Sequence, residues 1–443
     1  MPAATGSTAD GATVMELGDA LAWLDRHEGR ATVDGHRSAS GRPSERMAAL
    51  VDVLGHPEAA APVIRVVGVH GKTATIGAIA ALLTAKGLSV GTLTGPHLDR
   101  LNERLVVDGQ AIADDELAKV LSDLADLDGL VPGPASSWRE LLTAAALRWF
   151  SDRPVDVVVL EGGGLEDPAA VVDPAVLVVT DLEPGGSPPG GRADGSPVLA
   201  LPAGVPVVLG DPDPGGGDAL RRGLPPHPLW QVGRDYACTA NHLAVGGRTL
   251  DIRTPGATYR GVWLGLHGRH QGDNFATALA AVEAFFGAPV EEPLVREAAA
   301  AVRAPGQLEA VAHRPTVVVD RACDLVAARL VGESVPEAFA AARSRILVVG
   351  LPEGAEAEPL LAALGAGSTR LVVACAPDAP HAQSSASIVR AAGALGLEVL
   401  ERDTVREALD SALGAAHPDD LVLVVGPPAV VAATRAALGA GRR

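Results

Sequence analysis

The fold is indicated by residues 63–77, which read VIRVVGVHGKTATIG. The apolar run at 63–67 is typical of a buried strand, and the alanine-rich segment after Lys72 is typical of a helix. Between them, Gly68 and Gly71 allow a tight turn that brings backbone N–H groups close to an anion. This order of strand, glycine turn and lysine-headed helix predicts a phosphate-binding loop in an α/β domain.

The loop is shorter than a complete GxxxxGK[ST] motif, because Val66 stands where the first glycine belongs. An ordinary strand–turn–helix without a ligand is therefore the alternative. The chain has only three lysines, Lys72, Lys86 and Lys119, and otherwise uses arginine, which favours a specific role for Lys72. The candidate phosphate-binding residues are Gly68, His70, Gly71, Lys72, Thr73 and Ala74.

Similar strand-like runs recur along the first part of the chain. They are short, apolar and non-alternating, as expected for strands buried on both faces of a parallel sheet, and they lie at 63–69, 89–95, 155–162 and 175–182. Helical segments at 76–87 and 136–152 separate them. Residues 236–266 predict a β-meander, followed by a helix at 274–287. Residues 184–226 are rich in Pro, Gly and Asp and predict a mobile surface loop or lid.

A second α/β block follows the segment RAPGQLE at 303–309. Its expected strands lie at 316–320, 345–350, 369–375, 397–401 and 420–426, with alanine-rich helices between them. We therefore expect two α/β domains, residues 1–303 with the phosphate loop and residues 304–443 with a Rossmann-like arrangement.

Composition narrows the class of protein. The net charge of −18 argues against nucleic-acid partners and against binding to an anionic membrane. Three widely spaced cysteines favour neither a disulfide framework nor a zinc site. No signal peptide or membrane-length apolar run is recognisable. We expect a cytoplasmic monomer that acts on small molecules.

Three polar residues outside the loop stand where ligands bind in such folds. Glu161 ends a predicted central strand, where a carboxylate can hold Mg²⁺ beside a triphosphate, although it can also cap a helix. Asn274 begins a helix and can either cap it or hydrogen-bond a base edge. Asp320 ends a strand of the second block, where it can contact a ligand or only begin a loop.

These segments together resemble the folylpolyglutamate synthase/dihydrofolate synthase branch of the Mur ligase superfamily, from about residue 15 to the C-terminus. Residues 63–75 are similar to its V-x-G-T-N-G-K-G-S loop. Residues 87–117 are similar to its G-x-x-T-S-P-H-L-x-x-x-N-E-R-I segment, and this match is the most specific. Residues 268–281 and 304–311 resemble its G-x-H-Q-x-x-N-A-x-x-A and W-P-G-R-L-E motifs.

The resemblance implies an N-terminal Mur-type ATPase domain and a C-terminal Rossmann-like domain. It also implies a ligase in which ATP phosphorylates a carboxylate and an amine, usually that of glutamate, attacks the acyl-phosphate. Lys72 and Glu161 would then be catalytic, with Glu161 as the Mg²⁺ ligand, Asn274 near adenine and Asp320 on the nucleotide. His97, Asn102 and Arg104 would lie on the substrate side, unless they form an ordinary polar loop.

Several positions depart from the family pattern, most of them around the metal and the transferred phosphoryl group. The metal-binding serine of T-S-P-H is Gly95, and the arginine of P-G-R-L-E is Gln307. In the D-x-A-H-N motif, Cys323 and Asp324 replace His and Asn. The metal-binding His of I-T-x-I-x-x-D-H is missing from 179–186, and no lysine after Lys119 could be the carbamylated lysine.

Two functions remain open at this point. The first is a ligase with a remodelled, weaker metal site that joins a non-standard acid to an amino acid, with arginines such as Arg303 or Arg321 restoring positive charge. The second is a catalytically impaired relative that binds a nucleotide or a partner and regulates. Lys72 and Glu161 favour the ligase, and the missing metal ligands favour the regulator.

Overall fold

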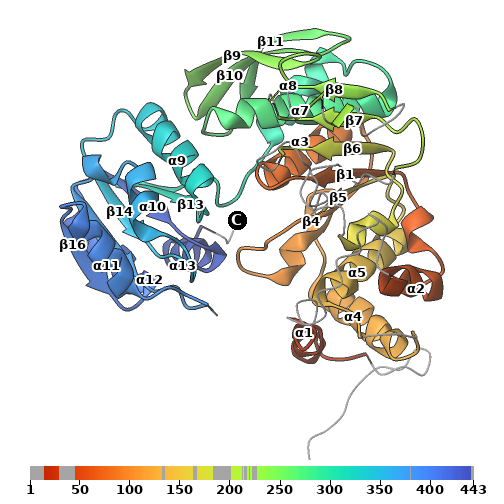
Figure 1. Cartoon of the computed structure of the whole chain (residues 1–443), viewed down its shortest axis with the longest axis horizontal. Coiled ribbons are helices and arrows are strands. Elements are labelled where there is room, and N and C mark those ends of the chain that lie inside the picture. The colour runs from red at the N-terminus through yellow and green to blue at the C-terminus, as the bar shows by residue number, and fades with distance from the viewer. Residues whose placement is uncertain are drawn as a thin grey trace, which may run out of the picture.

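The computed structural model describes residues 14–28, 45–131, 135–162, 167–182, 201–211, 213, 217–218, 220–221, 227–379 and 381–440. These residues form two lobes, one coloured red to green and the other blue in Figure 1. Within the described ranges, no helix has both the length and the apolar character needed to cross a membrane.

The first lobe is built on an eight-stranded sheet with the order β4-β3-β2-β5-β1-β6-β7-β8. Six neighbouring strands are parallel, namely β2, β5, β1, β6, β7 and β8. Strands β3 and β4 continue the sheet beyond β2 in antiparallel pairs. Their bounds are β1 (Val63–Val67), β2 (Val90–Leu93), β3 (Leu105–Val107), β4 (Gln110–Ala111), β5 (Val157–Glu161), β6 (Val176–Val179), β7 (Val207–Leu209) and β8 (Leu229–Gln231).

Helices cover both faces of this sheet, which explains why its strands do not alternate between apolar and polar residues. In β5, Val157 and Val159 pack with one group of helices, whereas Val158 and Leu160 pack with the other. The first group is α3 (Lys72–Ala85), α7 (His270–Phe286) and α8 (Glu292–Ala301). The second group is α1 (Leu17–Asp25), α2 (Glu45–Val53), α4 (Asp114–Asp128) and α5 (Trp138–Asp152).

A three-stranded antiparallel sheet packs on α7 and α8 at the end of the first lobe (Figure 1). Its strands are β9 (Ala237–Ala244), β10 (Gly247–Arg253) and β11 (Thr258–Leu264), which confirms the predicted meander. Short 3₁₀ helices complete this lobe at η2 (Pro57–Ala59), η3 (Leu101–Arg104) and η4 (Pro168–Val171).

The second lobe is a six-stranded sheet with the order β12-β13-β17-β14-β15-β16, parallel except for β12. The strands are β12 (Glu309–His313), β13 (Thr316–Asp320), β14 (Arg345–Val349), β15 (Leu371–Cys375), β16 (Val399–Arg402) and β17 (Leu421–Val425). The helices are α9 (Leu325–Ala338), α10 (Ala357–Ala363), η5 (Ala366–Ser368), α11 (Ser385–Ala394), α12 (Val405–Ala415) and α13 (Pro428–Leu438).

Five strands were not expected from the sequence: β3, β4, β7, β8 and β12. The expected loop at 184–226 is partly wrong, because β7 lies inside it and pairs with β6 and β8. Most of the remaining loop lies outside the described residues. The division of the chain between residues 303 and 304 remains a proposal, although α8 ends at Ala301 in the first lobe and β12 begins at Glu309 in the second.

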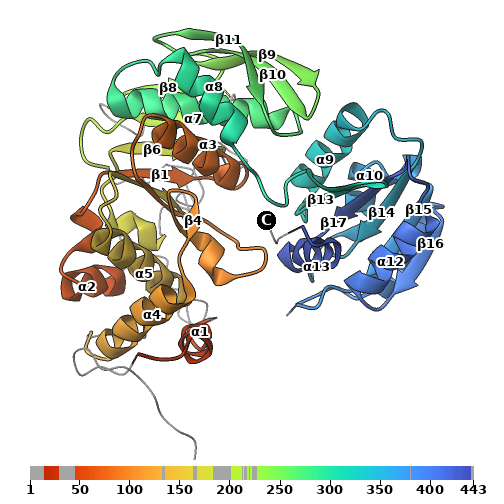
Figure 2. The ribbon, with the colours of Figure 1, turned by 180° about the vertical axis from the view of Figure 1, so that it is seen from behind.

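Helix α9 lies on the side of the second lobe that faces the first, as the two opposite views show (Figure 1 and Figure 2). Both of its ends contact the first lobe through ion pairs. Asp324, the N-cap of α9, lies 3.3 Å from His70, and Glu337 near its last turn lies 3.1 Å from Arg248. The lobes therefore meet next to the loop after β1.

Candidate active site

The loop after β1 has the geometry of an anion-binding turn. Helix α3 begins at Lys72, as the sequence predicted, and its N-cap Gly71 has φ 76°. A side chain at Gly71 would meet Asn274 Oδ1 at 2.7 Å, so only glycine fits between the loop and the first turn of α7. The backbone N–H groups at the start of α3, with the positive end of its helix dipole, point out of the loop.

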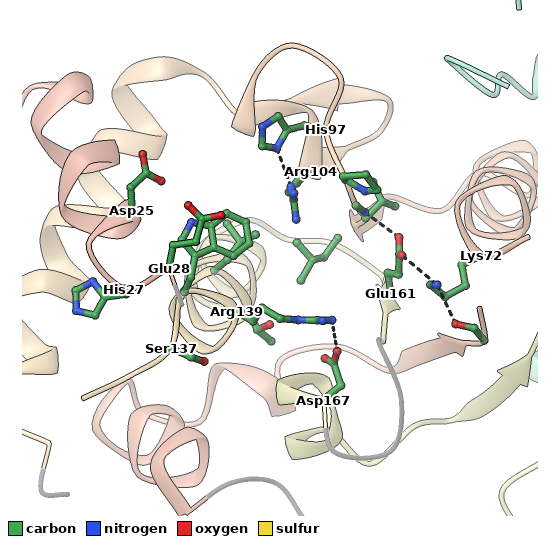
Figure 3. Close-up of a pocket in the computed structure, with 18 of the residues that line it drawn as sticks. Asp25, His27, Glu28, Lys72, His97, Arg104, Ser137, Arg139, Glu161 and Asp167 are labelled. Carbon is green, nitrogen blue, oxygen red and sulfur yellow. Dashed lines mark hydrogen bonds and ion pairs between the residues drawn. The ribbon is translucent and has the colours of Figure 1, made fainter. Parts of the chain in front are cut away.

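The ammonium of Lys72 turns back over this loop. Its Nζ donates to the carbonyls of Gly68 (2.9 Å) and Val69 (3.2 Å) and lies 3.8 Å from Glu161 Oε1 (Figure 3). Lys72 and Glu161 come from α3 and the end of β5, which are adjacent because β5 pairs with β1. The structure therefore brings together the two residues that were expected to be catalytic.

Glu161 is the acidic residue at the centre of this group. Its Oε2 accepts a hydrogen bond from the N–H of Gly95 at 2.8 Å. Burial raises the pKa of Glu161, and the positive charges of Lys72, Arg321 and Arg104 oppose that rise. The carboxylate is therefore held among cations, an environment suited to an anionic ligand next to it.

Asp181 contacts the phosphate loop directly, and the sequence analysis did not identify it. Its Oδ1 accepts from the N–H of Val69 (2.5 Å), and its Oδ2 accepts from the N–H of His70 (3.1 Å). Burial alone would raise the pKa of Asp181, but the hydrogen bonds from His70 and Val69 hold it below its usual value. A carboxylate thus occupies two of the loop N–H groups that a phosphate could use.

His70 connects Asp181 to the second lobe. Its Nδ1 lies 3.0 Å from Asp181 Oδ2, and its Nε2 lies 3.3 Å from Asp324 Oδ1. The hydrogen bond with Asp181 raises the pKa of His70, burial opposes this, and Asp324 adds to it. Asp324 also caps α9 by accepting from the N–H groups of Val326 and Ala327, both at 2.9 Å.

Two of the three expected substrate-side residues lie together. Arg104 Nε donates to His97 Nδ1 at 2.8 Å, and the guanidinium carbon lies 4.8 Å from the centre of the Trp138 ring. Asn102 is separated from them. It is 6% exposed, and its Nδ2 donates to the carbonyl of Ile112 (2.8 Å) and to Asp114 (3.0 Å). The side chain of Asn102 therefore holds the local backbone in place.

The remaining expected nucleotide residues have local partners too. Asn274 lies against Gly71, and its Nδ2 donates to Gln271 Oε1 at 3.1 Å. Asp320 is buried, and its two oxygens accept from the N–H groups of Leu308 and Ala322, both at 2.8 Å. Burial raises the pKa of Asp320 to about 6. Both carboxylate oxygens of Asp320 thus accept hydrogen bonds from backbone N–H groups of the second lobe.

A cavity of about 920 Å³ opens beside Lys72 and Glu161 (Figure 3). His97 and Arg104 line it together with Gly68 and Val69 of the phosphate loop. It also reaches residues that the sequence analysis did not propose: Asp25, His27, Glu28, Ser137, Trp138, Arg139, Leu142, Thr143 and Asp167. They belong to α1, the turn after it, α5 and η4, which only the tertiary fold brings together.

The donor set around the loop suits at most one divalent ion. Among the described residues, no group of three or more His, Cys, Asp or Glu side chains is arranged to hold a metal. Among the described residues, Glu161 is the carboxylate that pairs with Lys72. The Thr73 hydroxyl follows Lys72 in α3 and donates to the Gly95 carbonyl at 3.3 Å. An ion shared between these oxygens and nucleotide phosphates would fit; a protein-built pair of metal sites would not.

Comparison with known proteins identifies the family. Residues 307–427 match the model of the Mur ligase, glutamate ligase domain. The chain is 32% identical over 323 residues to a dihydrofolate synthase/folylpolyglutamate synthase of Mycobacterium tuberculosis, and the alignment covers 66% of each chain. It is 25% identical over 429 residues to the folylpolyglutamate synthase of Lacticaseibacillus casei, covering 92% of this chain and 96% of that one.

The fold agrees over nearly the whole length. The solved structure of Mycobacterium tuberculosis folylpolyglutamate synthase complexed with ADP superimposes with a TM-score of 0.85 and 28% identity, covering 96% of this chain and 98% of that chain. The α/β architecture expected from the sequence, with a parallel-sheet N-terminal region and a C-terminal α/β region, is therefore confirmed. The chain belongs to the folylpolyglutamate synthase/dihydrofolate synthase branch of the Mur ligase superfamily.

Proposed function

We propose that this protein is an ATP-dependent ligase that joins a carboxylic acid to an amine through an acyl-phosphate. The observation that carries the proposal is the position of Lys72, at the N-terminus of α3, 3.8 Å from Glu161 and at one end of a large cavity. A helix N-terminus with a lysine favours a phosphate, and the adjoining cavity has room for an acid. The family supports amide formation driven by ATP.

In this proposal the chain positions charges around the transferred group. Lys72 and the N–H groups at the start of α3 hold the nucleotide phosphates. Glu161 and the Thr73 hydroxyl would hold one divalent ion beside these phosphates, and that ion would supply positive charge that stabilises the transferred phosphoryl group. Arg104 faces the cavity, where it orients the acid. The acid carboxylate attacks the terminal phosphorus and ADP leaves; the amine then attacks the acyl carbon and phosphate leaves.

We propose further that the acid is not a folate and that the amine belongs to an amino acid. Gln307, Cys323 and Gly95 stand where the family pattern has an arginine, a histidine and a serine. The removal of one group that stabilises developing charge costs about 3–4 kcal/mol, so several changes at one site favour a different substrate geometry. The lack of nucleic-acid partners remains a prediction from the net charge, and the cytoplasmic location and the monomeric state remain predictions from the sequence.

A nucleotide- or partner-binding regulator is the second candidate. The observation that favours it is Asp181, which engages the N–H groups of Val69 and His70. A regulator would bind nucleotide without forming ADP in the presence of any acid and amine. Measurement of ADP formation with panels of acids and amino acids separates the two candidates, because only the ligase needs all three substrates for turnover.

Replacement of Lys72 by alanine tests the shared nucleotide site. A charge-assisted hydrogen bond contributes roughly 1.5–3 kcal/mol, so Lys72→Ala should weaken ATP binding by about tenfold or more in calorimetric titration. Lys86→Ala is the matched control, because Lys86 follows the same helix at its other end and pairs with Glu291 at 2.8 Å. Equal ATP affinity in Lys72→Ala and Lys86→Ala would exclude Lys72 as a phosphate ligand.

A further inference from the structure

Two arginines from different parts of the chain adjoin the peptide Gly95–Pro96, and Lys72 lies beside the carboxylate of Glu161 to which this peptide is hydrogen-bonded. Gly95 N–H donates to Glu161, whose other oxygen lies 3.8 Å from Lys72 Nζ. A Cβ built on Gly95 would lie 3.0 Å from Arg104 Nη1, so this guanidinium fills the space beside the glycine. From the second lobe, Arg321 Nη1 donates to the Pro96 carbonyl at 3.4 Å.

Arg321 follows β13, and its backbone is held by the segment before β12. The N–H of Arg321 donates to the carbonyl of Gly306 at 3.1 Å. Gly306 has φ 69°, and a Cβ there would lie 3.3 Å from Arg321 Cδ, so a glycine leaves room for the arginine side chain. The buried carboxylate of Asp320 accepts hydrogen bonds from the N–H groups of Leu308, just before β12, and Ala322, just after β13. Asp320 therefore supports the position of Arg321.

The charges at this point favour an anion. Lys72, Arg104 and Arg321 carry three positive charges, and Glu161 carries one negative charge. Burial lowers the pKa of Arg321, and the nearby carboxylates of Asp320 and Glu161 oppose this, so the guanidinium carries its positive charge close to Glu161. The three cations stabilise the negative charge of a phosphoryl group, and a guanidinium can contact two phosphate oxygens at once.

We propose that Arg321 contacts the terminal phosphoryl group of ATP and that Lys72, Arg104 and Arg321 together supply the positive charge that a second metal ion would otherwise provide. This inference rests on the proposed function, since it needs ATP at the loop of residues 68–73. The donor set agrees with it, because the described residues around Glu161 fit one shared ion and no protein-built pair. Arg321 belongs to the second lobe, so the site is complete only when both lobes take part.

Arg303, the other arginine considered as a source of charge, is excluded by its contacts. Its Nη1 donates to the carbonyls of Ala300, Ala301 and Val302, at the C-terminal end of the preceding helix α8. It therefore serves as the matched control for Arg321. Both arginines lie close to the connection between the lobes, but only Arg321 contacts the Gly95–Pro96 segment.

The test compares affinities for ADP and for a non-hydrolysable ATP analogue, in Mg²⁺ and in EDTA, with the full-length chain. We expect the wild type to prefer the analogue over ADP even in EDTA. Arg321→Gln should lose that preference through an about tenfold weaker analogue affinity, with ADP affinity unchanged. Arg321→Lys should retain part of the preference, and Arg303→Gln all of it. Equal thermal unfolding midpoints would show that the variants fold.

Several outcomes would overturn the inference. It fails if Arg321→Gln binds both nucleotides like the wild type, if it weakens both equally, or if the wild type has no preference for the analogue in EDTA. If Arg321→Gln is unstable, Arg321→Lys alone decides, and an unchanged analogue affinity with a tightly bound second Mg²⁺ would contradict the proposal. If Lys72→Ala weakens ATP binding and Arg321→Gln does not, the inference fails but the proposed function stands. If both variants bind ATP as tightly as the wild type, the proposed function fails as well.

Discussion

The carboxylate of Asp181 accepts hydrogen bonds from two backbone N–H groups of the phosphate loop, those of Val69 and His70. A bound phosphate would compete for these donors and would be repelled by the carboxylate. The ammonium of Lys72 likewise donates two hydrogen bonds, to the carbonyls of Gly68 and Val69. At the residue scale, the loop is therefore satisfied by its own side chains, and a nucleotide must displace some of these contacts in order to bind.

Asp181→Asn should strengthen nucleotide binding. Removal of one negative charge within about 4 Å of a phosphate gains roughly 1 kcal/mol even in bulk water, which is about fivefold in Kd. Calorimetric titration with ATP measures the change. Asp211→Asn is the control, because Asp211 accepts from the N–H of Leu182 at 3.0 Å and does not contact the loop. Unchanged or weaker ATP binding in Asp181→Asn would show that this carboxylate only shapes the loop.

The phosphate loop and the nearness of Glu161 to Lys72 could be predicted from the sequence, but most of the other contacts of the loop could not. The order of strand, glycines and Lys72 is local information, and parallel strands end at one edge of the sheet, which places Glu161 near Lys72. The same rule could have identified Asp181, because it follows β6, the other neighbour of β1. The sequence offered both Arg303 and Arg321 as sources of positive charge, but it could not separate them, because the contact of Arg321 with Pro96 depends on how the two lobes pack.

At the scale of elements, α9 links the phosphate loop to the meander. Its N-cap Asp324 pairs with His70, and Glu337 pairs with the fully buried Arg248 of β10 through both carboxylate oxygens, at 3.1 and 3.2 Å. The helix itself was expected as part of an alternating α/β pattern. Strands β7, β8 and β12 were missed because they have three to five residues and carry little periodic signal.

The His70–Asp324 contact should make stability depend on pH. The partners Asp181 and Asp324 raise the pKa of His70 in the folded protein. A raised pKa contributes stability that is complete below the unfolded value, about 6.5, and is lost as pH rises through the folded value. The unfolding midpoint of the wild type, relative to His70→Asn, should therefore fall as pH rises from about 6 to 9. Asp181 stays ionised over this range because its own pKa is lowered.

The exposed His381 provides the control for this measurement. It pairs with Glu353 at 3.3 Å in the second lobe and has φ 59°, a conformation that asparagine tolerates. His381→Asn removes an imidazole next to a carboxylate in the second lobe, so it serves as the matched control for the His70→Asn substitution. A difference between wild type and His70→Asn that stays constant, or grows with pH, would show that His70 gains no stabilising charge from its two carboxylates.

At the scale of the whole molecule, the cavity adjoins the charged residues around the phosphate loop. The cavity runs from Lys72 and Arg104 to Asp25 and Glu28, and the positive charge of Arg321 from the second lobe acts on Glu161. The family and the fold define the architecture, whereas we propose that the substrate depends on Gly95, Gln307 and Cys323, where this chain departs from the family pattern. These three positions lie in three different connections between helices and strands.

We expect little or no folylpolyglutamate synthase activity from this assembled site. Gln307 does not supply a positive charge; instead it accepts a hydrogen bond from Gln271 at 3.2 Å. Gly95 offers no hydroxyl, and the guanidinium of Arg104 fills the space beside it, which changes how an acid carboxylate can approach the phosphate loop. An acyl-phosphate made from a folate would therefore meet a different arrangement of charges from that in enzymes with the unaltered motifs.

Dihydropteroate or tetrahydrofolate, supplied with glutamate and ATP, should yield no new amide detectable by mass within ordinary reaction times. ADP formation measured in the same mixtures shows whether ATP is consumed without amide formation. The Mycobacterium tuberculosis folylpolyglutamate synthase, which shares the fold, serves as the positive control. Turnover within roughly 1–10³ s⁻¹, the usual range of enzymes, would contradict the expectation. The chain would then be a folate ligase in which arginine side chains supply the positive charge that the altered motifs lack.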